Sequence, residues 1–90
     1  MKIKVTVAVE EILHRDIEVV VDAPTFIEAE ARAEALVKAR YEAGEIVLLS
    51  GDRTDNLVEE EYSDVARDWD NDHADYIVAD DGTWRKGVKA

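Results

Sequence analysis

The chain contains no cysteine, one proline and two histidines in 90 residues. Without cysteine it can form no disulfide bridge, no thiolate zinc site and no cysteine nucleophile, and this composition fits a reducing compartment. No apolar run approaches the ~20 residues of a membrane span, and Met1 leads directly into an alternating pattern rather than a signal peptide. We therefore expect a soluble, cytoplasmic protein that does not contact a membrane.

Basic residues are also scarce, because 11 Lys and Arg face 22 Asp and Glu, and the formal net charge is −11. Twelve of the carboxylates lie between Asp52 and Asp81, where only Arg53 and Arg67 oppose them. A surface this negative repels nucleic acid and anionic lipid, so the expected partner is a basic protein rather than nucleic acid. An acidic halophile proteome would spread carboxylates evenly, whereas here they concentrate in one stretch.

The length predicts one small domain, residues 1–90, that buries roughly 60–65% of its unfolded-chain surface. We divide it into a β-β-α-β core at residues 1–49 and an acidic C-terminal extension at residues 50–90. A domain of this size is only modestly stable alone, so self-association as a homodimer would help it.

Two segments near the N-terminus alternate apolar and polar residues with the period of a strand that buries one face. The apolar positions are Ile3, Val5, Val7 and Val9 in the first segment and Ile17, Val19 and Val21 in the second. Because the connection carries no Asn-Gly or Asp-Gly signal, we expect Ile12 and Leu13 to reach back toward the core.

A helix is predicted between Pro24 and Gly44. Thr25 and Glu28 have the spacing of a capping box, in which each side chain satisfies a free backbone N–H at the helix start. On a helical wheel one side is apolar and contains Phe26, Ala29, Ala33, Leu36, Val37 and Tyr41. Arg40 falls within this arc, which is tolerable if its stem packs and its guanidinium reaches water.

Residues 45–49 (EIVLL) are too short and too β-branched for a second helix, so we expect a third strand parallel to the second. The predicted fold is α+β, with an antiparallel or mixed sheet in strand order 3-1-2 and one long helix on one face. Its core would contain Ile3, Val5, Val7, Ile17, Val19, Val21, Phe26, Leu36, Val37, Ile46 and Leu48.

Two interpretations stay open for residues 57–69. Helical spacing relates Val58, Tyr62, Val65, Ala66 and Trp69, whereas a short edge strand within residues 61–66 is the rival. We expect residues 68–75 to form a solvated acidic loop, and residues 76–79 and 83–88 to pair as a hairpin around Asp81-Gly82.

The first half carries a recognisable order of elements. A strand ends in Val9-Glu10-Glu11-x-Leu13, a strand rich in Val and Glu and a helix rich in Ala and Glu follow, and then comes Tyr41-x-x-Gly44-Glu45-Ile46-Val47-Leu48. This pattern resembles the DpnD/PcfM-like proteins, small proteins found on phages, plasmids and restriction loci. The resemblance implies an origin on a mobile element and a β-β-α-β core, and it brings no catalytic residues.

Metal binding and catalysis are not expected. Residues 68–75 contain Asp68, Asp70, Asp72, His73 and Asp75, but the calcium-loop register fails because position six from Asp68 is His73 rather than glycine. We expect His14 to lie exposed in a hairpin turn, and Ser50 and Ser63 lie in no nucleophile-elbow context. We therefore assign no metal ligand, no cofactor and no enzymatic activity.

Acidic and aromatic residues occur together in the C-terminal half. Carboxylates at helix or strand spacing repeat every ~6–7 Å, close to the phosphate spacing of a nucleic-acid strand, and exposed Trp and Tyr often anchor interfaces. We expect an acidic inhibitor of a basic host nuclease or surveillance complex, an anti-restriction or anti-CRISPR protein that acts as a nucleic-acid mimic. The expected partner-binding residues are Glu59, Glu60, Glu61, Tyr62, Asp64, Asp68, Trp69, Asp70, Asp72 and Asp75. The alternatives are a homo-oligomeric structural or regulatory module that is acidic for solubility, and a weak divalent-metal-binding protein.

Overall fold

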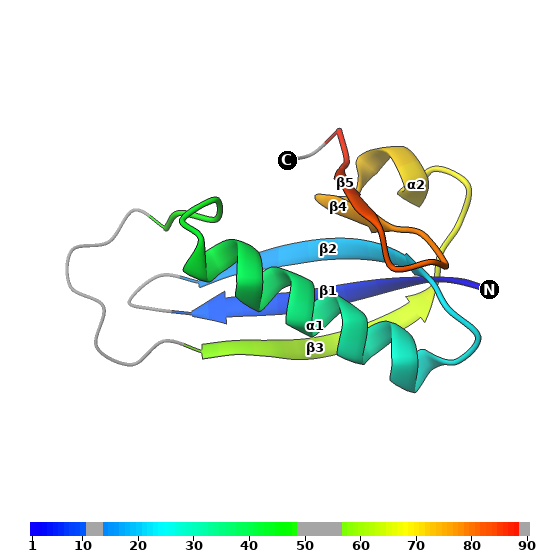
Figure 1. Ribbon diagram of the computed structural model, residues 1–90, viewed down its shortest axis with the longest axis horizontal. Helices are drawn as coiled ribbons and strands as arrows, with labels where there is room; N and C mark the ends of the chain where they lie inside the picture. The colour runs from blue at the N-terminus through cyan, green and yellow to red at the C-terminus, as the bar shows by residue number, and fades with distance from the viewer. Residues whose placement is uncertain (11–13, 49–56, 89–90) are drawn as a thin grey trace.

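The computed structural model describes residues 1–10, 14–48 and 57–88, and these form one mixed five-stranded sheet with a long helix on one face (Figure 1). The elements are β1 (Lys2–Glu10), β2 (His14–Asp22), α1 (Phe26–Glu42), β3 (Leu57–Val65), α2 (Asp70–His73), β4 (Tyr76–Val78) and β5 (Trp84–Lys86). The strand order is β3-β1-β2-β4-β5, and only the β2–β4 pair is parallel. The predicted α+β class is confirmed. No helix among the described residues is long and apolar enough to cross a membrane.

The helix α1 begins and ends where the sequence predicts. The Oγ1 of Thr25 accepts a hydrogen bond from the backbone N–H of Glu28 at 3.2 Å. At the other end Gly44 has a φ of 83°, and the N–H groups of Gly44 and Glu45 donate to the carbonyls of Tyr41 and Arg40. This pair of bonds is a Schellman motif, which needs the left-handed conformation that glycine adopts without strain.

The core lies between α1 and one face of the sheet. The strands β1, β2 and β4 send alternate residues to this face, and α1 covers them with Ala29, Ala33, Val37 and Tyr41. All eleven predicted core residues belong to this cluster or pack against it, Phe26 and Leu36 being partly buried. The expectation for Ile12 and Leu13 lies outside the described residues.

The predicted third strand at residues 45–49 is wrong. Ile46 and Leu48 are buried, but residues 45–48 form no strand, and Leu49 lies outside the described residues. The predicted place beside β1, parallel to β2, is taken by β3, which pairs with β1 from Leu57 to Val65. Thus the helix interpretation of residues 57–69 is wrong and the edge strand is right in kind, although β3 begins at Leu57 rather than within residues 61–66. The strand satisfies the backbone groups along the free edge of β1.

The segment between β3 and β4 crosses the sheet on the face opposite α1. The Nζ of Lys4, on the alternate face of β1, lies 3.4 Å from the carboxylate of Asp70 in α2. The connections from β2 to β3 and from β3 to β4 each join two parallel strands, and such crossovers are right-handed. Because the chain crosses the sheet in opposite directions in these two connections, they lie on opposite faces. The predicted solvated loop at residues 68–75 is therefore wrong in part, because Asp70 and Asp75 are buried.

The last two strands form a short antiparallel hairpin at the β2 edge, next to α2 (Figure 1). Its turn contains Gly82 at a φ of 89°, and Asp81 accepts hydrogen bonds from the backbone N–H and the hydroxyl of Thr83. The guanidinium of Arg40 stacks over the Trp84 ring at 4.7 Å, and Trp84 meets Tyr76 edge to face. The hairpin therefore closes the core beside the end of α1.

Candidate functional site

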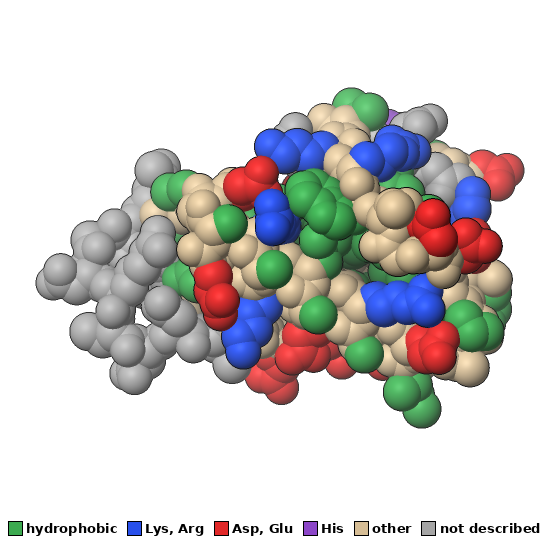
Figure 2. All heavy atoms as spheres, viewed as in Figure 1, with side chains coloured by type: hydrophobic (Ala, Val, Ile, Leu, Met, Phe, Trp, Pro, Cys, Tyr) green, Lys and Arg blue, Asp and Glu red, His purple; other side chains and the backbone are tan. Residues whose placement is uncertain are grey.

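The face of the sheet opposite α1 carries most of the chemistry-bearing side chains, and we call it the open face. In β1 and β2 it is formed by Lys2, Lys4, Thr6, Ala8 and Glu10, and by His14, Asp16, Glu18, Val20 and Asp22. The crossover through α2 covers its middle, where Lys4 joins Glu18 and Asp70. On the side that α1 covers, Lys and Arg side chains are interspersed with Asp, Glu and hydrophobic side chains (Figure 2).

Carboxylates gather on the open face at the end that α2 leaves uncovered, and along β3 as far as Asp64, which pairs with Lys4. The registers Ala8↔Asp16 and Ala8↔Glu59 place the two acids on either side of a small residue. We define the acidic face as Glu10, Asp16, Glu59, Glu61 and Asp64. A shallow hollow of about 280 Å³ opens over Ala8 and is lined by Glu10, Glu59, Glu60 and Glu61.

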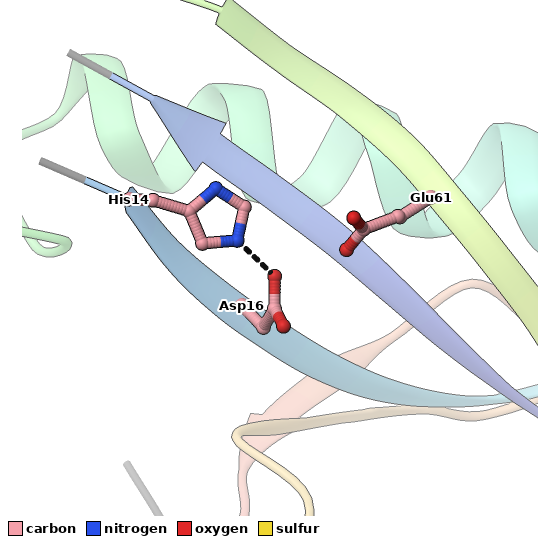
Figure 3. Close-up of side chains that lie close together, drawn as sticks. All are labelled: His14, Asp16 and Glu61. Atoms are coloured by element: carbon pink, nitrogen blue, oxygen red, sulfur yellow. Dashed lines mark hydrogen bonds and ion pairs between the residues drawn. The ribbon is translucent and has the colours of Figure 1, made fainter.

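A β-bulge in β3 sets the direction of Glu61. Thr6 pairs with Tyr62 and Val7 with Glu60, so Glu61 is an extra residue that opposes no single position of β1. A bulge re-aims side chains at a sheet edge. Here it sends Glu61 to the open face, where it points toward His14 and Asp16 (Figure 3).

His14 lies between carboxylates on this face. Its Nε2 is 2.6 Å from Asp16 and its Nδ1 is 2.9 Å from Glu10. The hydrogen bonds to Glu10 and Asp16 raise the pKa of His14 above its ordinary value of 6.5. The expected turn position is wrong because His14 is the first residue of β2, although its exposure is as predicted.

Glu60 points the other way, toward α1. Burial, followed by the negative charges of Glu30, Glu34 and Glu59, raises the pKa of Glu60 above its ordinary value of 4.5. On the same side of β3, Ser63 donates a hydrogen bond to Glu30 at 3.0 Å. The three consecutive glutamates therefore divide between two faces, and Glu60 crowds the helix instead of joining the acidic face.

Two of the expected partner-binding residues hold the fold together. Asp70 accepts a hydrogen bond from the N–H of Arg67 at 2.7 Å and forms an ion pair with Lys4. Asp75 accepts one from the N–H of Glu18 at 2.9 Å and lies 3.7 Å from Arg15. Because both side chains are buried and already paired, we leave them out of the surface that a partner would meet.

The other expected binding residues are mostly at the surface. Glu59, Glu61, Asp64 and Asp68 are exposed, and the side chain of Asp72 lies outside what the structure describes. Tyr62 and Trp69 are 55% and 57% exposed, and the guanidinium of Arg67 lies 5.2 Å from the Trp69 ring centroid. Of the aromatic residues Tyr62, Trp69, Tyr76 and Trp84, which lie in or beside the acidic stretch, Tyr76 alone is buried.

Sequence reasoning missed the contribution of the first hairpin to this surface. Glu10, His14 and Asp16 lie far from residues 52–81 in the chain, and the sheet brings them beside Glu61. The signal was the strand alternation itself, because residues at even positions of β1 and β2 share the face opposite the core residues at odd positions. The chain matches no family model, and comparisons with curated proteins and with solved structures find no match.

Proposed function

We propose that this chain is a non-enzymatic binding protein whose acidic face docks onto a basic protein. The observation that carries the proposal is the convergence of five exposed or half-buried carboxylates from three strands on one side of the sheet. Among the described residues, the nearby cations are engaged elsewhere, Lys4 with Glu18 and Asp70, and Arg15 with Asp75. A partner's lysines and arginines would complete the charge balance.

The sheet edge next to this surface favours a basic partner over a second copy of the chain. β3 is an edge strand, and Glu59, Glu60 and Glu61 lie along it. Charged residues on an edge strand oppose edge-to-edge pairing. A second β3 would set glutamates against glutamates, whereas a basic segment would meet opposite charges.

The resemblance to DpnD/PcfM-like proteins supports a sharper form of the proposal. In that form the partner is a basic, nucleic-acid-handling host-defence protein, and the carboxylates stand in for phosphates. Neighbouring carboxylates on a strand repeat at ~6.8 Å, near the phosphate spacing of one nucleic-acid strand. Exposed Tyr62 and Trp69 would then act as interface anchors beside the charges.

Affinity capture from a nuclease-treated bacterial lysate, with EDTA present and at two ionic strengths, tests the proposal. Two variants of equal charge are compared: Glu59→Gln/Glu61→Gln/Asp64→Asn changes the acidic face, and Glu28→Gln/Glu42→Gln/Asp80→Asn changes exposed acids elsewhere. We expect wild type and the second variant to retain Lys- and Arg-rich proteins that the first variant loses, and high salt to weaken retention. Equal capture by both variants would contradict the proposal.

A further inference from the structure

Three ligand-bearing side chains from two strands converge at the uncovered end of the open face. The nitrogen of His14 and the carboxylate oxygens of Asp16 and Glu61 all lie within 4.8 Å of one another. Figure 3 shows the three side chains directed into the same space on the face opposite α1. Residues distant in the chain meet there because β1 lies between β2 and β3.

We infer that His14, Asp16 and Glu61 form a binding site for a divalent transition-metal ion such as Zn²⁺. Zn²⁺ binds both imidazole nitrogen and carboxylate oxygen, whereas Mg²⁺ and Ca²⁺ prefer oxygen alone. Ligands of a tetrahedral Zn²⁺ ion stand roughly 3.4 Å apart, and the three donors already lie within 4.8 Å of one another. The inference does not depend on the partner proposed above.

Glu10 orients the histidine from outside the ligand set. Its carboxylate lies 2.9 Å from Nδ1, and Asp16 lies 2.6 Å from Nε2. A carboxylate that holds the Nδ1 hydrogen of a histidine leaves Nε2 to bind the metal, an arrangement typical of zinc sites. The ion would replace the proton between Nε2 and Asp16, and that proton would pass to solvent.

The surroundings leave room for the ion. The hollow over Ala8 is lined by Glu61, one of the three ligands, and by Glu10 and Glu59, so the local charge is strongly negative. All three ligands are exposed, so an ion bound here would keep open positions for water or for a donor from another molecule. An open position distinguishes such a site from a closed structural zinc site.

The chain supplies its own matched control, because it has only two histidines. His73 is exposed like His14 but bonds the carbonyl of Trp69 through Nδ1. Isothermal titration with Zn²⁺ should give one saturable site in wild type and in His73→Ala, and at least about tenfold weaker binding in His14→Ala and Glu61→Gln. Titration with Mg²⁺ should be the same in wild type and His14→Ala.

Imidazole ¹⁵N chemical shifts give a second readout on the intact protein. Adding Zn²⁺ should move Nε2 of His14 and leave the His73 ring unchanged, and Glu10→Ala should weaken binding by about tenfold. Circular dichroism verifies that each variant is folded. Absence of saturable Zn²⁺ binding in wild type, or equal losses in the His14 and His73 variants, would overturn the inference.

Discussion

Asp75 and Glu18 bind each other twice across the β2–β4 boundary. The N–H of Asp75 donates to the Glu18 carbonyl at 2.8 Å, and the Asp75 carboxylate accepts from the Glu18 N–H at 2.9 Å. The parallel ladder begins one residue later, at Val19↔Tyr76. A side chain thus extends the pairing of two strands by one position, which explains why an aspartate from the acidic stretch is 2% exposed.

Removing this carboxylate should destabilise the fold. Asp75→Ala leaves a buried N–H of Glu18 without its acceptor, at a cost of about 1–3 kcal/mol. Asp75→Asn keeps a carbonyl oxygen at the same place and should cost less. Urea unfolding of both variants measures the difference, and an Asp75→Ala protein as stable as wild type would show that the bond contributes nothing.

The burial of Val7 in the core leads to a second prediction, which concerns stability. Val7 is fully buried beneath α1, so Val7→Asp places an unpaired charge among apolar side chains. We expect the variant to be unfolded at room temperature by circular dichroism, whereas Val7→Ala should still fold, with a loss of about 1–3 kcal/mol. A cooperative transition of Val7→Asp near the wild-type melting temperature would refute the described core.

The raised pKa of Glu60 leads us to expect that the stability of the protein depends on pH. Burial, with the charges of Glu30, Glu34 and Glu59, raises the pKa of Glu60 in the folded protein. The folded state therefore binds the proton of Glu60 more tightly than the unfolded state does. The resulting loss of folding free energy is present at neutral pH and disappears as the pH falls below the pKa of Glu60 in the unfolded chain. Glu60→Gln should therefore raise the melting temperature at pH 7 by a small amount, worth about 0.5 kcal/mol or less.

At about pH 3.5, where unfolded glutamate is protonated, the same variant should match wild type. Glu42→Gln, at the exposed end of α1, is the control. A loss of stability on Glu60→Gln at pH 7 would mean that the Glu60 carboxylate is held by a favourable interaction.

The two tryptophans should respond differently to truncation. Trp84 stacks on Arg40 and meets Tyr76 edge to face, so Trp84→Ala should lower stability by about 1–2 kcal/mol. Trp69 is 57% exposed, and Trp69→Ala should change stability much less. If Trp69 anchors a partner, its variant should instead shorten the lifetime of the complex in surface plasmon resonance. Equal stability losses in the two variants would contradict this assignment.

Local signals were enough to predict the first two strands, the helix and the core. Thr25, Glu28 and Gly44 act within their own turns, and apolar residues recur at every second position of β1 and β2, so each element could be inferred from its own residues. The third strand could not, because residues 45–48 have the composition of a strand but form none in the described part of the chain. Which segment pairs with β1 depends on the free edge available in three dimensions.

The acidic surface could likewise be predicted from the sequence only in part. Charge counting found the carboxylates of β3, but it could not separate exposed Glu59 and Glu61 from buried Asp70 and Asp75. Those burials depend on Lys4 and on the backbone of Glu18, more than fifty positions away in the chain. The His14 cluster was missed because it needs both the hairpin register and the bulge at Glu61.

The position of β1 has a consequence for synthesis of the chain. Ile3 pairs on one side with Val21 but on the other with Val65, 62 positions later. While the ribosome extends the chain, β1, β2 and α1 can meet early, yet one edge of a valine-rich strand stays unpaired until β3 emerges. Such an edge invites pairing between nascent chains. We therefore expect products truncated before residue 57 to aggregate, and full-length chains to reach the native state slowly for their size.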